Sequence, residues 1–500
     1  MSERVRSVAV VGRDASLWLA AAALQRALGR TDVRVHAVEL DSRLTQVDAY
    51  AAVPTLAAMH RLLGIDERLV LQVCKGVPMV AQRFSNWANN ARPYMIAYDD
   101  ELGGSELPFS QYWTKGTLEG LRVGLEDFSL GAACARLNAV PVSGEEPAPL
   151  SASYGYQLDA PLYAELIKQF AIRLGVEIAP ATVRDVVISG DRIERVNLTD
   201  GSELASDLYI DASGRQGLLL GQLAGAGFED WSEWLPCNRM VTATAPRMAQ
   251  LPAFAQISAF GGGWVGQFPL QDRTVVSAVY SSGAVSDDEA VKIAGVLARS
   301  SLRGEAVVSH LRPGMQRTPW IGNCVGVGEA AIAVDPVDAV ELHVTHGCIS
   351  HLMTLFPATA EAFPEADAYN RAIRSFGANL RDFQAAHYVL NRRFDDRLWD
   401  RVRDAHLPPE LKGKIDLFSA RSAVPLNDEE SFHEQSWAAL LVGCGVQPQD
   451  YDPRVDSIPA EVHVQRMQQR LRDVASLARQ MPPVERFLAL EQPSPALVGE

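Results

Sequence analysis

The sequence predicts an α/β fold that opens with a strand–helix–strand unit. An apolar strand runs into Gly12, a helix is expected at residues 17–28, and a second strand at 33–39 ends on an acid. A glycine after a first strand and an acid at the end of the second are typical of a parallel sheet that binds dinucleotides. We therefore expect a Rossmann-like domain, with Glu39 where a ribose hydroxyl would be held.

The expected phosphate turn lacks two of its three glycines. A complete turn reads G-x-G-x-x-G, so that backbone can approach a pyrophosphate and the helix can pack closely on the strand. The second and third positions hold Asp14 and Leu17. We expect the Asp14 carboxylate to cap the helix and to repel a phosphate, because like charges about 4 Å apart repel by roughly 1–4 kcal/mol near a protein surface. The neighbouring Arg13 leaves weak nucleotide binding open as an alternative.

A second nucleotide contact is expected further along the chain. Residues 183–198 read as a β-hairpin with a Ser-Gly-Asp turn. The strand that follows, at 207–214, ends in an acid, small residues and a glycine, which places Asp211 and Gly214 beside the expected phosphate turn.

The remainder of the chain divides by its periodicity. Residues 236–320 favour strands and turns, whereas helical periodicity dominates from 360 onward, through 376–390 and 462–479. With 500 residues and 47% hydrophobic content, the chain can bury a large core in two connected lobes.

Charge and composition exclude several function classes. The net charge is −15 without a basic block, so a nucleic-acid partner is not expected. A signal-peptide core and an apolar stretch long enough to cross a bilayer are both missing, so we expect a cytoplasmic protein with no membrane partner. The six cysteines form no C-x-x-C pair and read as buried free thiols; no metal site is expected.

Several stretches in order along the chain resemble the flavin-dependent halogenases of the tryptophan-halogenase family. They are residues 61–67, 84–87, 109–113, 156–160, 211–214, 228–231, 234–237, 320–324, 382–383, 387–388, 394–395 and Trp399. The resemblance is strong evidence for the fold and weaker evidence for the activity.

The resemblance implies an architecture and a cofactor. An FAD-binding domain of the glutathione-reductase and monooxygenase type would occupy 1–360, with a β-rich substrate lobe inserted at about 85–205 and 236–320. A helical region at 361–500 would pack on that lobe. Reduced FAD would react with oxygen and halide, and a lysine would deliver the halogen to an aromatic substrate. Family members are often dimers.

The lysine of the family is replaced here. Counting twelve residues on from Glu67 and eight back from Trp87 both reach Met79. A thioether cannot form a chloramine or donate a hydrogen bond, and it would be oxidised to a sulfoxide. Lys75 lies four residues early and reads as a surface lysine.

The halide site is altered as well. The family reads E-P-L-E-[SA]-T-[GS], whereas residues 335–341 read D-P-V-D-A-V-E. Asp338 retains a carboxylate at the position of the motif's second glutamate. Val340 and Glu341 replace the small pair whose backbone amides would hold the halide, and Glu341 would add negative charge there.

Two further signatures have changed. The W-x-W-x-I-P motif keeps Trp264 and Pro269 but has Gly266 for its second tryptophan. The flavin strap G-E-A-T-[VI]-P is A-Y-A-A-V-P at residues 49–54.

We interpret these changes as loss of the halogenase chemistry, so that no catalytic residue is expected and FAD binding is weak or lost. The chain would act as a homodimer, as a partner of an active halogenase paralogue, or as a binder of an aromatic small molecule. The alternative is an active FAD-dependent halogenase or monooxygenase acting on an aromatic, indole-like substrate. His343, His346 and His351 read as residues of one helix, and Cys444 as a loop thiol.

Overall fold

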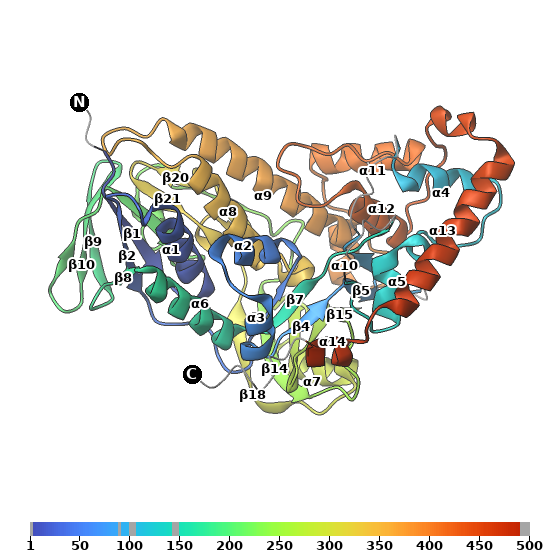
Figure 1. Ribbon diagram of the computed structural model, residues 1–500, viewed down its shortest axis with the longest axis horizontal. Coiled ribbons are helices and arrows are strands. Elements are labelled where there is room, and N and C mark those ends of the chain that lie inside the picture. Colours follow the sequence, from blue (N-terminus) through green and yellow to red (C-terminus); the bar gives the residue numbers. More distant parts are fainter. Residues whose placement is uncertain (1–3, 89–91, 100–106, 143–149, 491–500) are drawn as a thin grey trace. The chain divides into compact units, whose positions relative to one another are not determined.

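The computed structural model describes residues 4–88, 92–99, 107–142 and 150–490 (Figure 1). Its contacts divide the chain into two compact units, each assembled from three segments. The first unit contains residues 1–76, 158–232 and 311–378; the second contains 77–157, 233–310 and 379–500.

A mainly parallel sheet forms the centre of the first unit, which confirms the predicted α/β, Rossmann-like fold class. Its strand order is β20-β21-β12-β1-β2-β8, and all neighbours are parallel except β20 and β21. The bounds are β1 Ser7–Gly12, β2 Arg34–Glu39, β8 Glu177–Ile178, β12 Leu208–Ala212, β20 Trp320–Ile321 and β21 Cys324–Gly326.

The first unit's helices pack through small side chains. Ala20, Ala21, Ala22 and Ala23 of α1 are fully buried, which lets α1 lie close to α6 and α8. The helices are α1 Asp14–Leu28, α2 Thr55–Leu63, α3 Glu67–Val73, α6 Ala160–Leu174 and α8 Glu341–Thr354. Helix α1 therefore begins three residues before the expected start at Leu17.

The predicted hairpin is confirmed and covers part of the central sheet. Strands β9 Val183–Ser189 and β10 Arg192–Leu198 are antiparallel and are joined by β11 Glu203–Leu204 in a three-stranded sheet. Ala9 and Val11 of β1 share a core with Ile193 and Val196 of β10. The unit's short strands are β3 Ala49–Ala52, β13 Phe228–Asp230, β19 Gly314–Gln316 and β22 Ile332–Ala333.

A seven-stranded sheet dominates the second unit, in the order β18-β14-β17-β16-β15-β5-β6. Only β5 and β15 are parallel neighbours. The bounds are β5 Ala81–Ser85, β6 Tyr94–Ala97, β14 Arg239–Pro246, β15 Phe254–Phe260, β16 Gly263–Pro269, β17 Arg273–Tyr280 and β18 Arg303–His310.

The second unit contains helices where strands were expected, and α7 is the clearest case. Residues 236–320 were expected to hold strands and turns, but α7 (Asp287–Ala298) packs on β17 and shares its core. The signal was present, because Ser286 and Glu289 form a capping box at the start of α7.

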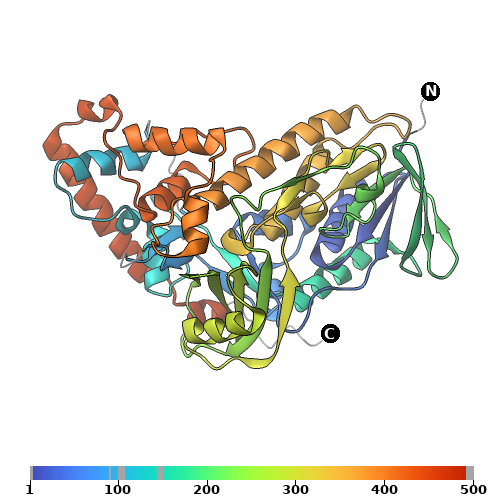
Figure 2. The same cartoon turned by 180° about the vertical axis from the view of Figure 1, so that it is seen from behind.

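The C-terminal region is helical, as predicted (Figure 2). The helices expected at 376–390 and 462–479 are parts of the longer α9 and α13. The bounds are α9 Glu365–Val389, α10 Arg397–Arg403, α11 Pro409–Arg421, α12 Glu434–Gly443, α13 Ala460–Gln480 and α14 Val484–Leu490. Two further helices of the second unit, α4 Phe109–Leu118 and α5 Leu130–Arg136, come earlier in the chain. Within the described residues, none of the helices has both the length and the apolar character needed to cross a bilayer.

A buried ion pair joins two segments of the second unit. Lys414 Nζ of α11 lies 2.8 Å from a carboxylate oxygen of Glu430, and the two side chains are 1% and 5% exposed. The Lys414 ammonium also lies 5.1 Å from the centre of the Trp437 ring. Desolvating two charges is costly, so the pair holds the segments in place only while both partners are present.

We expect Lys414→Met to destabilise the protein by about 3–5 kcal/mol, because the Glu430 carboxylate would stay buried without its partner. The double variant Lys414→Met/Glu430→Leu should lose clearly less than this. Urea unfolding of the two variants and the wild type measures both values. A double variant that is less stable than Lys414→Met would contradict this explanation.

Candidate functional site

The residues predicted to bind nucleotide lie together at the carboxyl ends of β1, β2 and β12. In the strand register, Gly12 lies beside Glu39 of β2, and Val11 lies beside Asp211 of β12. Asp14 follows β1 closely, and Gly214 follows β12. This edge is where a sheet of this type holds a dinucleotide.

Close packing of two strands requires the glycine at position 12. A Cβ there would lie 2.4 Å from the backbone oxygen of Ala212 on β12. No side chain fits at that distance, so Gly12 is needed for the sheet as well as for the turn.

Asp14 retains a glycine-like backbone in the turn. Its φ is +54°, in the left-handed region that aspartate tolerates better than most residues. Its carboxylate accepts hydrogen bonds from the Ser42 hydroxyl and from the Arg43 backbone N–H, the latter at 3.2 Å. The expectation that Asp14 caps the helix is therefore wrong: the carboxylate ties the turn to the segment after β2, and no side chain caps α1.

Two arginines connect the loops around this turn. Arg13 donates from Nε to the backbone oxygen of Ser213 at 3.1 Å and from Nη1 to that of Asp41 at 2.8 Å. Burial lowers the pKa of Arg13, and the like charge of Arg43 lowers it further. Arg43 donates to the side-chain oxygen of Gln216 at 2.9 Å. The loops after β2 and β12 are thus held together by the protein's own groups.

Glu39, at the expected ribose position, already has a cationic partner. Its carboxylate lies 2.6 Å from Lys168 Nζ of α6, and the Lys168 ammonium lies 5.2 Å from the centre of the Trp18 ring. Both charged side chains are partly exposed, so the pair contributes little to stability. A ribose hydroxyl bound by Glu39 would have to compete with Lys168 for the carboxylate.

Asp211 organises the loop after β12. One carboxylate oxygen accepts the Ser213 N–H at 3.0 Å, and the other accepts those of Leu219 and Leu220 at 2.8 and 2.9 Å. Burial raises the pKa of Asp211 despite these bonds. Gly214 in the same loop has a φ of +87°, which favours glycine. Asp211 therefore shapes the loop, and a ligand would meet the loop's backbone.

Arg215, Glu329 and Glu341 form a group of charged side chains near the start of α8. Arg215 Nε lies 2.7 Å from a carboxylate oxygen of Glu329. Protein atoms crowd around the Glu341 carboxyl, although its side chain keeps contact with solvent, and this burial raises its pKa to about 8. Repulsion by Glu329 contributes to the rise and Arg215 opposes it. The raised pKa reduces the negative charge that Glu341 brings to the halide position.

The other residues of the halide position are buried. Asp338 is 2% exposed at the end of the 3-10 turn Pro336–Asp338, and Val340 is 1% exposed immediately before α8. Ala339 between them has a φ of +60°. No side chain caps α8, and N–H groups at a helix start attract anions. The assignment of a halide to this position stays a prediction.

The strap segment packs through an aromatic contact. Tyr50 of β3 is 6% exposed and meets the Tyr163 ring edge-on at 6.0 Å. Burial raises the pKa of Tyr50 well above its ordinary value. Apolar packing thus holds a strap that has lost the family's glycine, acid and threonine.

Met79 lies in the interior of the second unit. It ends β4 (Val77–Met79), pairs with Gly155 of β7 (Gly155–Asp159) and is 0% exposed. The exposed Lys75, with a φ of +51°, is a surface residue of the first unit as expected. Neither residue puts an amine at the family's lysine position.

The space of the missing second tryptophan is filled by a neighbour. A Cβ at Gly266 would lie 2.7 Å from the Phe268 ring and 3.1 Å from that of Trp264. Trp264 is fully buried and donates from Nε1 to the Tyr388 hydroxyl at 2.9 Å. The strand therefore keeps its aromatic packing with a different set of side chains.

The histidines and cysteines form no reactive group in the part of the chain that the structure describes. His343, His346 and His351 lie on α8, as predicted; burial lowers the pKa of His343 to about 4, and its Nδ1 lies 2.9 Å from the Thr55 hydroxyl. No metal-binding cluster occurs among the described residues. All six cysteines are free and buried, and burial raises the pKa of Cys444 to about 12.

Sequence reasoning missed three of the charged residues at this edge. Arg215 directly follows the acid–small–glycine segment and could have been found by extending that motif by one residue. Lys168 and Glu329 are far away in the sequence from the groups they pair with, so no local pattern announces them.

We expect the elevated pKa of Glu341 to give a pH-dependent stability. The folded state holds the proton up to about pH 8, whereas an unfolded glutamate releases it near pH 4.3. Stability therefore falls as the pH rises between these values. In urea unfolding, Glu341→Gln should gain stability relative to the wild type from pH 5 to pH 8. The control Glu361→Gln, at a glutamate outside the group formed by Arg215, Glu329 and Glu341, should show no such trend, and a constant difference for Glu341→Gln would refute the assignment.

The comparisons with known proteins agree over nearly the whole chain. The tryptophan halogenase family model matches residues 7–460. Tryptophan 7-halogenase RebH of Lentzea aerocolonigenes is 26% identical over 499 residues, which cover 92% of this chain and 93% of the relative. Tryptophan 7-halogenase KtzQ of Kutzneria sp. (strain 744) is 28% identical over 453 residues, and the alignment covers 85% of this chain and 83% of the relative.

Two solved structures are similar throughout. BrvH, a flavin-dependent halogenase from Brevundimonas sp. BAL3, matches with a TM-score of 0.91 at 28% identity, covering 98% of this chain and 100% of its own. Xcc4156, a flavin-dependent halogenase from Xanthomonas campestris, has a TM-score of 0.92 at 27% identity and covers 99% of this chain and 100% of its own. On the family match, this chain belongs to the tryptophan halogenase family of flavin-dependent halogenases.

Proposed function

We propose that this chain has lost the lysine-dependent halogenation of its family and acts as a non-catalytic protein. Its role would be that of a partner of an active halogenase paralogue, or of a binder of an aromatic small molecule. The buried Met79 at the lysine position is the observation that carries the proposal.

Met79 supports the proposal through its chemistry and its surroundings. A thioether has no N–H with which to form a nitrogen–halogen bond or to orient an oxidant. A buried amine at the same position would have to give up its hydration or its proton, so the methionine suits a packed interior. The side chain at position 79 therefore suits apolar packing better than it suits halogen transfer.

The nucleotide edge of the first unit supports weak or lost FAD binding. Asp14 stands at the second glycine position of the turn with its carboxylate bonded to Ser42 and Arg43, and Glu39 is paired with Lys168. These groups do not fit the phosphates and the ribose of FAD without rearrangement. We therefore derive no reaction step that uses the cofactor.

The second candidate is an active FAD-dependent halogenase or monooxygenase acting on an aromatic, indole-like substrate. The comparisons support this candidate better than the first, because RebH, KtzQ, BrvH and Xcc4156 are all named as halogenases. The Asp211 loop and the acid at Asp338 are also retained. Product formation and flavin binding distinguish the two candidates.

The proposal extends to the cellular compartment and the partners of the protein. Six buried free thiols suit a reducing compartment, which favours the cytoplasm. The net charge of −15 argues against a nucleic-acid partner. Because family members are often dimers, we propose that the chain forms a homodimer or a heteromer with an active paralogue.

The partner role is tested with an active halogenase from the same source. The two proteins are co-expressed with one of them tagged, and the rate of halogenation is measured with and without this chain. We expect co-purification or a change of rate. If neither occurs, the partner role is wrong and the ligand-binding role is the one left to test.

We expect the charge of Asp14, more than the shape of the turn, to block flavin. Asp14→Gly supplies the glycine that the φ of +54° favours, and Asp14→Asn removes the charge but keeps the size. Both should bind FAD about tenfold more tightly or better than the wild type in a fluorescence titration. Leu17 is fully buried, so Leu17→Gly would lower the stability as well and is less informative alone. Equal affinities of all three proteins would refute this role of Asp14.

We expect Met79→Lys alone to restore no halogenation, since the altered phosphate turn and halide position remain. The variant is supplied with FAD, a flavin reductase, bromide and either tryptophan or indole, and products are detected by mass spectrometry. Met79→Leu serves as the control for packing, and circular dichroism establishes that both variants fold. A brominated product from Met79→Lys would show that a single residue had silenced the enzyme and would favour the second candidate.

A further inference from the structure

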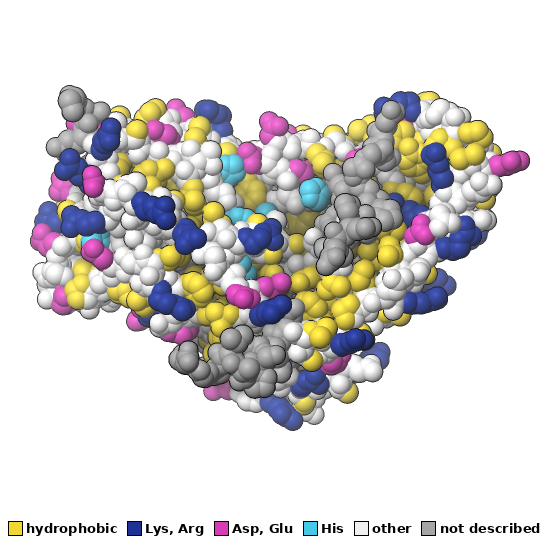
Figure 3. Space-filling model, in the orientation of Figure 1, with side chains coloured by type: hydrophobic (Ala, Val, Ile, Leu, Met, Phe, Trp, Pro, Cys, Tyr) yellow, Lys and Arg dark blue, Asp and Glu magenta, His cyan; other side chains and the backbone are white. Residues whose placement is uncertain are grey.

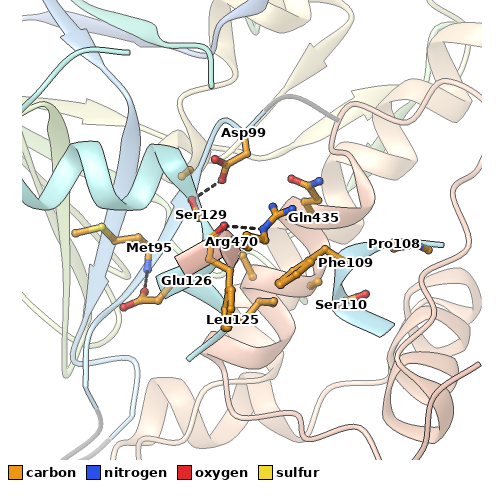
Figure 4. Close-up of a pocket in the computed structure, with 14 residues that line it drawn as sticks. Met95, Asp99, Pro108, Phe109, Ser110, Leu125, Glu126, Ser129, Gln435 and Arg470 are labelled. Carbon is orange, nitrogen blue, oxygen red and sulfur yellow. Dashed lines mark hydrogen bonds between the residues drawn. The ribbon is translucent and has the colours of Figure 1, made fainter. Parts of the chain in front are cut away.

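A pocket in the second unit lies outside the altered family sites. It is formed by β6, α4, the 3-10 turn Leu125–Phe128, α12 and α13. Its apolar wall includes Met95, Phe109, Phe128, Ala438 and Ala439 (Figure 4). Figure 3 shows hydrophobic side chains gathered where Figure 1 places α12 and α13.

Arg470 supplies a cation to this apolar wall. Its guanidinium lies 4.0 Å from the centre of the Phe109 ring, and its Nε donates to the backbone oxygen of Phe128 at 3.2 Å. Within the described residues, its two terminal amino groups have no hydrogen-bond partner. Arginine has five N–H donors, so four are left for another molecule.

The two acids that line the pocket, Asp99 and Glu126, already accept hydrogen bonds from protein groups. Asp99 accepts hydrogen bonds from the Ser129 hydroxyl and, at 2.9 Å, from the Gly131 backbone N–H. Glu126 lies 3.2 Å from Arg136 and accepts the Met95 backbone N–H at 3.1 Å. Burial lowers the pKa of Arg470, and the Asp99 carboxylate counteracts this effect.

We propose that this pocket binds a small arylalkyl carboxylate, with the carboxylate on the Arg470 guanidinium and the ring along the apolar wall to which Phe109 and Phe128 belong. A guanidinium and a carboxylate can form two parallel hydrogen bonds, which are stronger than neutral ones and gain strength away from water. The phenylalanine side chains offer the faces and edges that aromatic rings pack against.

The inference rests on the ligand-binding role proposed above and gives that role a site and a class of ligand. It does not involve FAD, Met79 or the nucleotide edge. Flavin binding and halogenation are measured in separate assays, so either proposal can fail without the other.

Calorimetric titration of the full chain with 3-phenylpropionate and with its uncharged amide, 3-phenylpropionamide, tests the proposal. We expect saturable binding of the acid at one site, about tenfold or more tighter than binding of the amide. Arg470→Gln should weaken the acid about tenfold or more and leave the amide unchanged. The matched control Arg472→Gln, an exposed residue of the same helix that donates to Gln469, should bind like the wild type.

A second variant keeps the test decisive if Arg470→Gln does not fold. Ala439→Phe leaves Arg470 in place and fills the pocket, so it should abolish binding of both the acid and the amide. The proposal is overturned if the wild type shows no saturable binding, if acid and amide bind equally, if folded Arg470→Gln binds the acid normally, or if Ala439→Phe still binds it.

Discussion

The close approach of β1 and β12 is the constraint on which the first unit depends. With a Cβ at Gly12 only 2.4 Å from the Ala212 oxygen, the strands can pair only through a glycine. The chain then turns through Asp14, whose positive φ keeps the geometry of a glycine. From this turn Asp14 bonds to the loop after β2 and Arg13 bonds to the loop after β12. The Asp211 carboxylate accepts backbone N–H groups within the loop after β12. The protein thus stabilises the edge of its sheet with its own charged groups.

A common pattern relates the two units, each considered by itself. Residues that shape the backbone are kept, whereas residues that would perform chemistry are replaced by residues that pack. Met79 fills the interior where the family has an amine, and the Phe268 ring lies beside Gly266 where the family has a tryptophan. In the first unit Tyr50 packs on Tyr163 in a strap without its polar residues. These apolar contacts keep the fold packed without the family's reactive side chains.

The sequence predicts the fold better than the site. The parallel sheet, the hairpin and the long C-terminal helices follow from apolar periodicity, which depends on neighbouring residues. Helix α7 was missed because a run of strands surrounds it, although its capping box was visible. The presence of Asp14 at the turn was predicted, but its bonding to Ser42 and Arg43 was not, because those partners come from another loop. Likewise, the raised pKa of Glu341 depends on the protein atoms around it and on Glu329, which no local pattern contains.

The central claim is that the chain has the halogenase fold without its flavin chemistry. Visible absorbance of the purified full chain, followed by titration with oxidised and reduced FAD, tests it most directly. The account predicts a colourless protein and no saturable binding of either form. A yellow protein that retains FAD through purification would contradict the claim and would identify the chain as an active flavin-dependent enzyme or a flavin carrier.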